Sequence, residues 1–154
     1  MHERKHSYLV KHDDLIFGSG WYDRDIELEQ EDPEAYTLAY VRQAIARYDT
    51  EGLGAVLERY NDPASVNGQW YVFIVGADDN FLAHAATPAR LGTDVKVLTD
   101  ANGYAHGKAI AEATEEGGWL NYTRVNPVSG LDEPKHSWVI RHDGLIFGSG
   151  YYTE

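Results

Sequence analysis

The sequence predicts one α+β domain with a central antiparallel sheet of about five strands. We expect a long N-terminal helix on one face of the sheet, and a short helix plus a connector on the other. Apolar residues first follow helical spacing, and short runs rich in β-forming residues come after them, each bounded by turn residues. Strands and helices do not alternate regularly, so a parallel sheet built from crossover units is not expected.

Composition excludes several classes of function. The 154 residues include no cysteine, and 13 Lys and Arg stand against 25 Asp and Glu, for a net charge of −12. Disulfide scaffolds, cysteine metal sites and thiol catalysis are therefore excluded. Without a basic cluster, nucleic acid and anionic membrane surfaces are not expected partners. No apolar run is long enough to span a bilayer, and the first ten residues lack the apolar core of a signal peptide.

An internal repeat dominates the organisation of the chain. Residues 5–22 and 135–152 are identical at 12 of 18 positions, without a gap, at an offset of 130. One interpretation is a pair of similar hairpins within one fold. The other is a tandem array with a period of 130 residues. We predict the array: residues 1–24 would be an orphan β-hairpin from the end of a preceding unit, and residues 25–154 the domain itself.

Each copy of the repeat predicts a β-hairpin. In the second copy, a run of strand-forming residues leads into a turn at residues 142–144, and a second run follows it. Gly144 suits the positive φ of a tight turn, which Asp14 tolerates less well. The Gly-Ser-Gly step at residues 148–150 predicts close approach by a ligand, a backbone or a bulky neighbour.

The long helix follows an acidic linker at residues 23–34. Asp32 is a suitable N-cap and Pro33 a suitable first helical residue. A stripe of tyrosine and alanine at helical spacing, from Tyr36 to Tyr48, predicts a face packed on the core. Gly52 weakens the helix, and a second helical segment is predicted at residues 53–60.

The remaining elements follow from turn residues and β-propensity. We predict strands at residues 69–75 and 81–85, with a turn between them at 78–80. Residues 86–102 predict a long connector, and residues 103–116 a short helix rich in alanine. A strand at residues 119–125 and the terminal hairpin complete the domain.

This ordered set of residues resembles the Cache domain, a PAS-like extracytoplasmic sensor module of bacterial receptors, in its single-Cache form. The resemblance covers residues 33–152. It rests on Trp70-Tyr71-Val72-Phe73, Phe81-Leu82-Ala83-His84, Leu91-Gly92-Thr93-Asp94, Asp100-Ala101-Asn102-Gly103, Gly118-Trp119, Tyr122, Asn126-Pro127, Lys135-His136-Ser137-Trp138 and Ile146-Phe147-Gly148-Ser149-Gly150-Tyr151-Tyr152. One departure is Ala85, because the family often has proline directly after the histidine of the second strand.

The resemblance implies a PAS-like, profilin-like sheet and a sensor rather than an enzyme. It implies a small-molecule ligand, such as acetate, propionate, pyruvate or lactate, and a location outside the cytoplasm in a chemoreceptor or related parent protein. It implies no cofactor. The alternative is a structural or dimerisation module of a tandem Cache array, in which the exposed edges of the N-terminal hairpin would support a homodimer.

A carboxylate in a closed pocket needs a cation or several donors, because burying a bare charge is very costly. We predict Lys135 and Arg90 for this role, although an edge lysine and a surface arginine are the structural alternatives. His84 would donate to the ligand or hold the connector, and a buried structural histidine is the alternative.

Aromatic and hydroxyl side chains complete the predicted site. Tyr71 and Tyr122 would supply donors, and Phe73, Trp119 and Trp138 an apolar wall. Ser137 belongs to the candidates because it shares a strand face with Lys135. Parity alone leaves open which face of the sheet meets the ligand.

No catalytic or metal site is predicted. Two pairs of histidines lie six residues apart, which spans about 20 Å of strand and is too far for shared metal ligation. Asp100-x-Asn102-Gly103 is only a fragment of a calcium loop, with Ala111 where the terminal glutamate would stand. No nucleophile-elbow motif surrounds Ser137 or Ser149.

Overall fold

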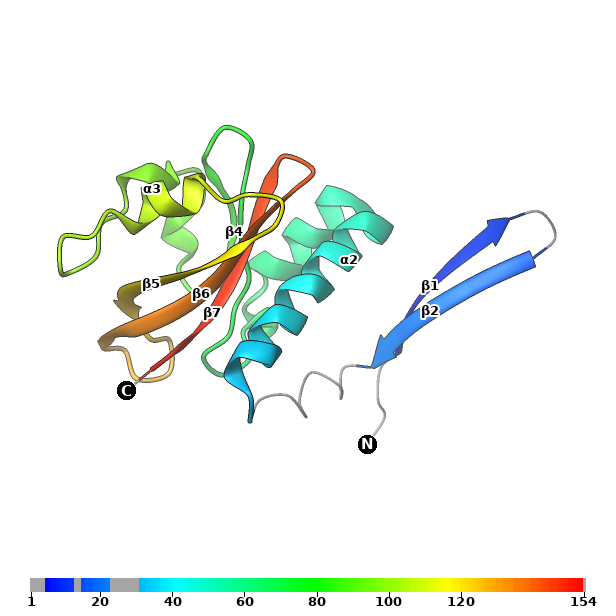
Figure 1. The fold of residues 1–154 in the computed structure, drawn as a ribbon, viewed down its shortest axis with the longest axis horizontal. Coiled ribbons are helices and arrows are strands. Elements are labelled where there is room, and N and C mark those ends of the chain that lie inside the picture. The colour runs from blue at the N-terminus through cyan, green and yellow to red at the C-terminus, as the bar shows by residue number, and fades with distance from the viewer. Residues whose placement is uncertain (1–4, 13–14, 23–30, 154) are drawn as a thin grey trace.

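The computed structural model describes the backbone of residues 5–12, 15–22 and 31–153, and the side chains of residues 31–153. Its elements are β1 (Lys5–His12), β2 (Leu15–Tyr22), α2 (Pro33–Asn61), η1 (Pro63–Ser65), β3 (Phe73–Val75), β4 (Phe81–His84), η2 (Pro88–Arg90), η3 (Val95–Val97), α3 (His106–Ala111), β5 (Gly118–Val125), β6 (Asp132–His142) and β7 (Leu145–Tyr152). Five strands form an antiparallel sheet in the order β4-β3-β7-β6-β5, and β1 and β2 form a separate two-stranded sheet (Figure 1). The predicted fold class is confirmed.

Helix α2 begins where the sequence predicts. The Asp32 side chain accepts a hydrogen bond from the Ala35 N–H at 3.1 Å, and Pro33 follows as the first helical residue. The two predicted helical segments form one element that bends at Gly52, where φ is 87° and ψ is 175°. Its buried face consists of Tyr36, Thr37, Tyr40, Val41, Ala44, Val56 and Tyr60.

The sheet is covered on both faces (Figure 1). On one face, α2 packs on a cluster that includes Val72, Ile74 and Phe147. On the other face, the connector and α3 pack on a cluster that includes Phe73, Val95 and Ile110. Adjacent residues of β3 therefore face opposite layers, as strand geometry requires.

Strand β7 lies in the middle of the sheet, and its glycines leave room for neighbours. A Cβ atom on Gly148 would lie 2.2 Å from the Phe73 ring, and one on Gly150 would lie 2.3 Å from Ser137 Oγ. The close approach predicted for the Gly-Ser-Gly step is confirmed, with Phe73 as the bulky neighbour at Gly148.

Some element boundaries differ from the prediction. Strand β3 is only three residues long, because Asn67 and Trp70 exchange backbone hydrogen bonds in a tight turn that ends just before Tyr71. The short helix α3 covers six residues rather than the predicted 14. Ala105 at its start has no side chain that can cap the helix, and turns follow Ala111. The connector contains two 3-10 turns, η2 and η3, which short-range patterns did not indicate.

The two hairpins share one register. Lys5 pairs with Tyr22 as Lys135 pairs with Tyr152, and every following pair corresponds at the offset of 130. Both predicted hairpins are therefore confirmed at the level of the backbone. The turn residues 13–14 and most of the acidic linker lie outside the described residues. The assignment of residues 1–24 to a preceding unit stays a prediction.

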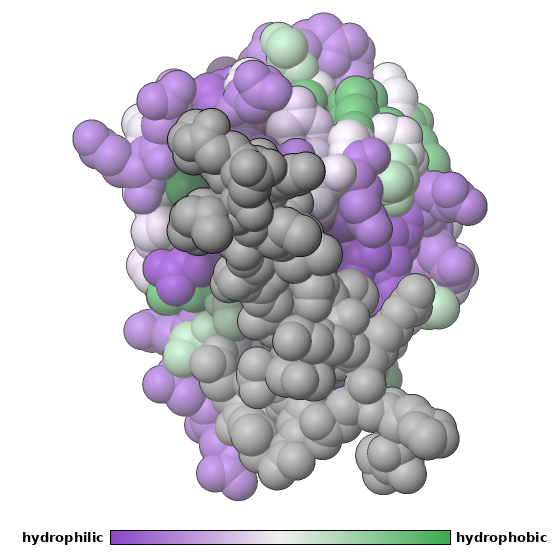
Figure 2. All heavy atoms as spheres, turned by 90° about the vertical axis from the view of Figure 1, so that its right-hand side faces the viewer, coloured by the Kyte–Doolittle hydropathy of each residue, from purple (hydrophilic) through white to green (hydrophobic). Residues whose placement is uncertain are grey.

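The described surface agrees with the acidic, polar composition. On the face shown in Figure 2, most of the coloured atoms are hydrophilic, with a smaller hydrophobic patch near the top. Among the described residues, the most exposed large hydrophobic side chains are Val97, Val128 and Leu131, at 68%, 69% and 65%.

Candidate ligand-binding site

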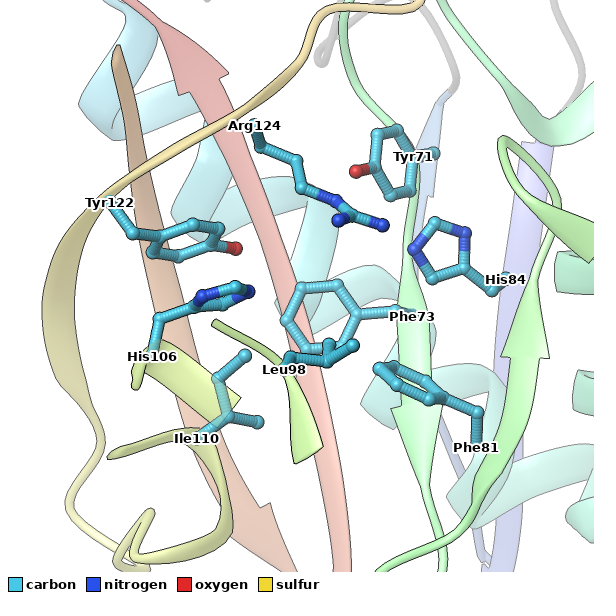
Figure 3. A pocket seen from close by; sticks show the side chains of 9 residues that line it. All are labelled: Tyr71, Phe73, Phe81, His84, Leu98, His106, Ile110, Tyr122 and Arg124. Atoms are coloured by element: carbon cyan, nitrogen blue, oxygen red, sulfur yellow. The ribbon is translucent and has the colours of Figure 1, made fainter. Parts of the chain in front are cut away.

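A pocket lies between the connector side of the sheet and α3 (Figure 3). It contains about 270 Å³ of space, part of which is open to solvent. Its lining residues are Tyr71, Phe73, Phe81, His84, Leu98, His106, Ile110, Tyr122 and Arg124. They come from β3 and the residues before it, β4, the connector, α3 and β5, so the pocket exists only when these elements are packed together.

The pocket has a polar end and an apolar end. Figure 3 shows Tyr71, Tyr122 and Arg124 in its upper part, and Phe81 and Ile110 below them. A ligand that spans both ends must therefore combine a polar group with a short apolar tail.

Lys135 lies directly behind the polar end. Its ammonium group donates to the Tyr71 hydroxyl at 2.9 Å and lies 4.0 Å from the centre of the Tyr71 ring. The residue is only 2% exposed. Burial lowers the pKa of Lys135 to about 8, with an opposing contribution from Tyr122 and a smaller lowering by Arg124. Among the described residues, the lysine is thus a buried cation that contacts aromatic rings and a hydroxyl.

Two arginines add positive charge to the same region. The Arg124 guanidinium is directed into the pocket between the Tyr71 and Tyr122 rings (Figure 3). Arg90 in η2 is half-buried nearby, and its pKa is lowered first by burial and then by Arg124. In the part of the chain that the structure describes, no carboxylate lies within 4.0 Å of Lys135, Arg90 or Arg124.

His84 is held in one tautomer. Its Nδ1 accepts a hydrogen bond from the Thr87 N–H at 3.0 Å, which leaves Nε2 as the N–H donor of the neutral ring. Burial, followed by the charges of Lys135 and Arg124, lowers the pKa of His84 to about 3. The backbone N–H of His84 donates to the Asn61 side chain at 3.1 Å, so the end of α2 also supports this wall.

His106 presents an unsatisfied polar atom. Its ring stacks on Tyr122 with centroids 4.4 Å apart, and the residue is 1% exposed. Nδ1 has no hydrogen-bond partner among the described residues. A buried nitrogen without a partner costs free energy, which a ligand in the adjoining pocket can recover. Burial, as the largest cause, lowers the pKa of His106, so the ring is neutral near pH 7.

The remaining polar contacts orient Tyr122. Its hydroxyl lies 3.0 Å from the Ser137 Oγ, and both residues are buried. Burial raises the pKa of Tyr122, so its hydroxyl stays protonated and can donate or accept.

The connector and α3 are fastened at both ends. Asp100 accepts backbone hydrogen bonds from Asn102 and Tyr104 within the connector, and from Thr123 of β5. At the other end, Arg141 of β6 donates to the carbonyls of Ala111 and Ala113, at 2.7 and 3.0 Å. The oxygens of Asp100 are thus used to hold the chain.

The structure brings together most of the predicted site residues. Tyr71, Phe73, His84 and Tyr122 line the pocket. The other predicted polar residues, Lys135, Ser137 and Arg90, lie in contact with this lining or within its electrostatic range.

Trp119 and Trp138 lie on the other face of the sheet. Trp119 stacks on His136 with centroids 4.4 Å apart, and Trp138 packs against the cluster under α2. Side chains alternate between faces along β6, so Trp138 points away from the face that carries Lys135. The prediction of Trp119 and Trp138 as part of the apolar wall is therefore wrong, because the sequence did not indicate which face lines the pocket.

Five lining residues did not emerge from the sequence. These are Phe81, Leu98, His106, Ile110 and Arg124. Arg124 could have been predicted, because it lies two residues after Tyr122 in β5 and side chains two residues apart in a strand point to the same face. His106 had no comparable signal, because its position depends on how the connector folds back onto the sheet.

Comparison with known proteins decides the family. Residues 48–154 match the family described as single Cache domain 2. The chain belongs to this family. No curated protein matches the chain at a significant level. In the described residues, no helix of this Cache domain is long and apolar enough to cross a membrane.

Solved structures show the same Cache fold. A methyl-accepting chemotaxis protein from Vibrio parahaemolyticus superposes with a TM-score of 0.65 at 21% identity, over 84% of this chain and 91% of that one. A Cache chemosensory domain described for carboxylic acid recognition gives 0.62 at 18% identity, over 86% and 99%. The periplasmic sensor domain of a chemotaxis protein gives 0.58 at 21% identity, over 85% and 92%.

Proposed function

We propose that this Cache domain is an extracytoplasmic sensor module of bacterial signal transduction that binds a small carboxylate. The observation that carries the proposal is the convergence of Lys135, Arg124 and Arg90 on one pocket without a carboxylate partner among the described residues. An anion in the pocket relieves the repulsion between these cations and recovers part of the cost of burying them.

Neutral donors would surround the same anion. Tyr71, Tyr122 and His84 place hydroxyl or N–H groups on the lining at the polar end. A carboxylate has two oxygens and accepts about four hydrogen bonds, so it can use a guanidinium fork and several of these donors together. We assign Arg124 the role of principal partner, because it is the arginine on the pocket lining.

The apolar end would limit the size of the ligand. Phe73, Phe81, Leu98 and Ile110 give this end an apolar lining, and the narrow space between them would admit only a short aliphatic tail. Acetate, propionate, pyruvate and lactate fit this description. One structural neighbour is described for carboxylic acid recognition and another as a periplasmic sensor domain, which supports the ligand class and the location.

A thermal-shift series tests the proposal. Propionate, acetate, pyruvate and lactate are compared with propionamide, which has nearly the same shape as propionate but no charge. A ligand at 100 times its Kd stabilises the folded state by about 2.7 kcal/mol, so at least one acid should raise the Tm while propionamide does not. A Tm unchanged by every acid would instead support the structural or dimerisation role. A Tm raised equally by propionamide would show that the site binds a small molecule without using its charge, which contradicts a carboxylate site.

A further inference from the structure

The hairpin β6–β7 makes a specific set of contacts with the rest of the domain. Lys135 and Ser137 contact Tyr71 and Tyr122 on the pocket side. On the other face, His136 Nε2 lies 3.7 Å from a carboxylate oxygen of Glu34 in α2. Gly148 and Gly150 have no space for a side chain.

The hairpin β1–β2 has the same amino acid as β6–β7 at each of these five positions. Lys5, His6 and Ser7 correspond to 135, 136 and 137, and Gly18 and Gly20 correspond to 148 and 150. Glycine weakens a strand unless close packing requires it, so its presence at both positions indicates a hairpin suited to this sheet. A hairpin paired only with itself needs neither glycine nor a lysine behind a pocket.

We infer that β1–β2 is a second copy of the pocket hairpin that can fill the place of β6–β7, between β3 and β5 of the same chain. In that arrangement β2 pairs with β3, β1 pairs with β5, and Lys5 takes the position of Lys135. The register shared by the two hairpins makes the replacement possible without a shift of any strand pair.

The connection to α2 allows this replacement within one chain. The end of β7 lies beside the start of α2, where Glu34 and Asp32 influence Tyr151 and Glu34 pairs with His136. Figure 1 shows the start of α2 and the end of β7 at the lower end of the domain. Nine residues separate Tyr22 from Asp32. This length can span about 30 Å, which is enough to join a β2 placed like β7 to α2.

Two differences explain why β6–β7 holds the place in the structure. Arg141 donates from separate nitrogens to the carbonyls of Ala111 and Ala113, whereas the corresponding Lys11 has a single ammonium group. Gly144 adopts a φ of 78°, and Asp14 stands in the corresponding position. The C-terminal copy is therefore the better fit, and the N-terminal copy is a weaker competitor.

Glycine variants of the full chain test the inference without any ligand. In Gly148→Val the added side chain collides with Phe73, so β1–β2 should replace β6–β7 and a cooperative melting transition should persist. Gly18→Val should leave the wild-type melting curve unchanged. The double variant has no acceptable hairpin and should lose the transition. If Gly148→Val alone loses it as completely, the inference is wrong.

A disulfide trap identifies the strand beside β5. Asn121 pairs with His136 across β5 and β6, and the chain has no cysteine of its own. In the Gly148→Val background, His6→Cys with Asn121→Cys should form a disulfide within one chain, because paired strand positions are close enough for the bond. Asn121→Cys with His136→Cys in the otherwise wild-type chain is the matched control. Failure of the 6–121 bond where the control bond forms overturns the inference, and a bond between two chains overturns its assignment to the same chain.

A third experiment uses propionate, and it rests on the proposed function. If propionate raises the Tm of the wild-type chain, Lys5→Met should remove that shift in Gly148→Val but leave it intact in the wild-type background. Loss of the shift in both backgrounds would contradict the role of Lys5 as the replacement. Because the glycine and disulfide experiments use no ligand, their outcome is separable from that of the proposed function.

Discussion

Lys135 places a buried charge directly behind the pocket. The ammonium group is buried, yet its hydrogen-bond partner is the neutral Tyr71 hydroxyl. A buried charge without an opposite charge is destabilising, and replacing it by an apolar side chain of similar shape often stabilises a protein. A lysine with this cost is best explained by a ligand that completes its environment.

Lys135→Met should therefore raise the stability of the ligand-free domain and abolish its response to propionate. We expect an increase in the free energy of unfolding of about 1–3 kcal/mol at pH 7, measured by urea denaturation. Lys108→Met is the matched control, because Lys108 is exposed, and its change should stay within about 0.5 kcal/mol. A destabilised Lys135→Met domain would contradict this account of the lysine.

The affinity for propionate should fall above about pH 8. A bound carboxylate favours the ammonium form, so its presence raises the pKa of Lys135 above the free value of about 8. Between these two values binding must take up a proton, and Kd should rise by about tenfold per pH unit. Calorimetry in two buffers of different ionisation enthalpy measures the uptake. Lys135→Arg stays charged throughout this range, so any binding it retains should vary less with pH.

Arg124 should contribute more to binding than any other arginine. Removing one partner of a charge-assisted hydrogen bond costs about 1.5–3 kcal/mol, so Arg124→Gln should weaken propionate binding by about 10- to 150-fold. Arg42→Gln, on the exposed side of α2, should leave the Kd unchanged. Equal effects of the two substitutions would show that general electrostatics rather than contact in the pocket controls affinity.

At the scale of elements, α2 depends on one unusual backbone conformation. Gly52 combines a φ of 87° with a ψ of 175°, a region almost restricted to glycine. Gly54 lies two residues later in the helical part, with open space around its Cα. The bend at Gly52 joins the two halves of the helix and lets both pack on the same cluster.

Alanine substitutions at these two glycines should have opposite effects. Gly52→Ala forces a side chain into a strained conformation and should cost about 1–3 kcal/mol. Gly54→Ala should stabilise the helix by about 0.5–1 kcal/mol, because alanine has the higher helix propensity. Chemical denaturation of the two variants measures both changes, and the same sign for both would contradict the assigned bend.

The elements were predictable wherever one local signal sufficed. Asp32 with Pro33 located the start of α2, and the repeat located both hairpins. The shortness of β3 was not predictable, because the turn at 67–70 depends on how Trp70 packs under α2. Likewise, the polar half of the site was partly predictable from motifs, whereas Leu98 and Ile110 enter the pocket only through the packing of the connector.

At the scale of the whole molecule, charge is segregated. The chain carries a net charge of −12, whereas the described pocket region gathers Lys135, Arg124 and Arg90 around neutral histidines. Screening in physiological salt acts over about 8 Å, so local cations rather than the net charge decide whether an anion is bound. An acidic protein can thus bind an anion at a site that is locally basic.

The ligand-free domain should lose stability between pH 6.5 and pH 5. The pKa of His84 is lowered to about 3 in the folded state, and the pKa of His106 is lowered in the same direction, so the unfolded chain binds more protons below about 6.5. Because His84 stays neutral in the folded state throughout this range, its contribution approaches a loss of about 1.4 kcal/mol per pH unit toward pH 5, and His106 adds to it in the same direction. Backbone hydrogen bonds also lower the pKa of Asp100, but its protonation would reduce the stability of the fold only at a pH below this range.

Urea unfolding at pH 7.5 and pH 5 measures this loss. His84→Gln removes the largest titrating group, so its stability should change less between the two pH values than that of the wild-type domain. An unchanged or steeper dependence in the variant would show that other groups control acid stability.

The fastening of α3 has a mechanical consequence. Arg141 holds the C-terminal end of this helix, and His106 begins its N-terminal end beside the pocket. A helix of six residues is a stiff rod about 9 Å long. Its N-terminal side is tied as well, because Asp100 accepts hydrogen bonds from Tyr104, just before the helix, and from Thr123 of β5. A pull on His106 therefore loads β5 through Asp100 and β6 through Arg141, instead of moving a loose helix.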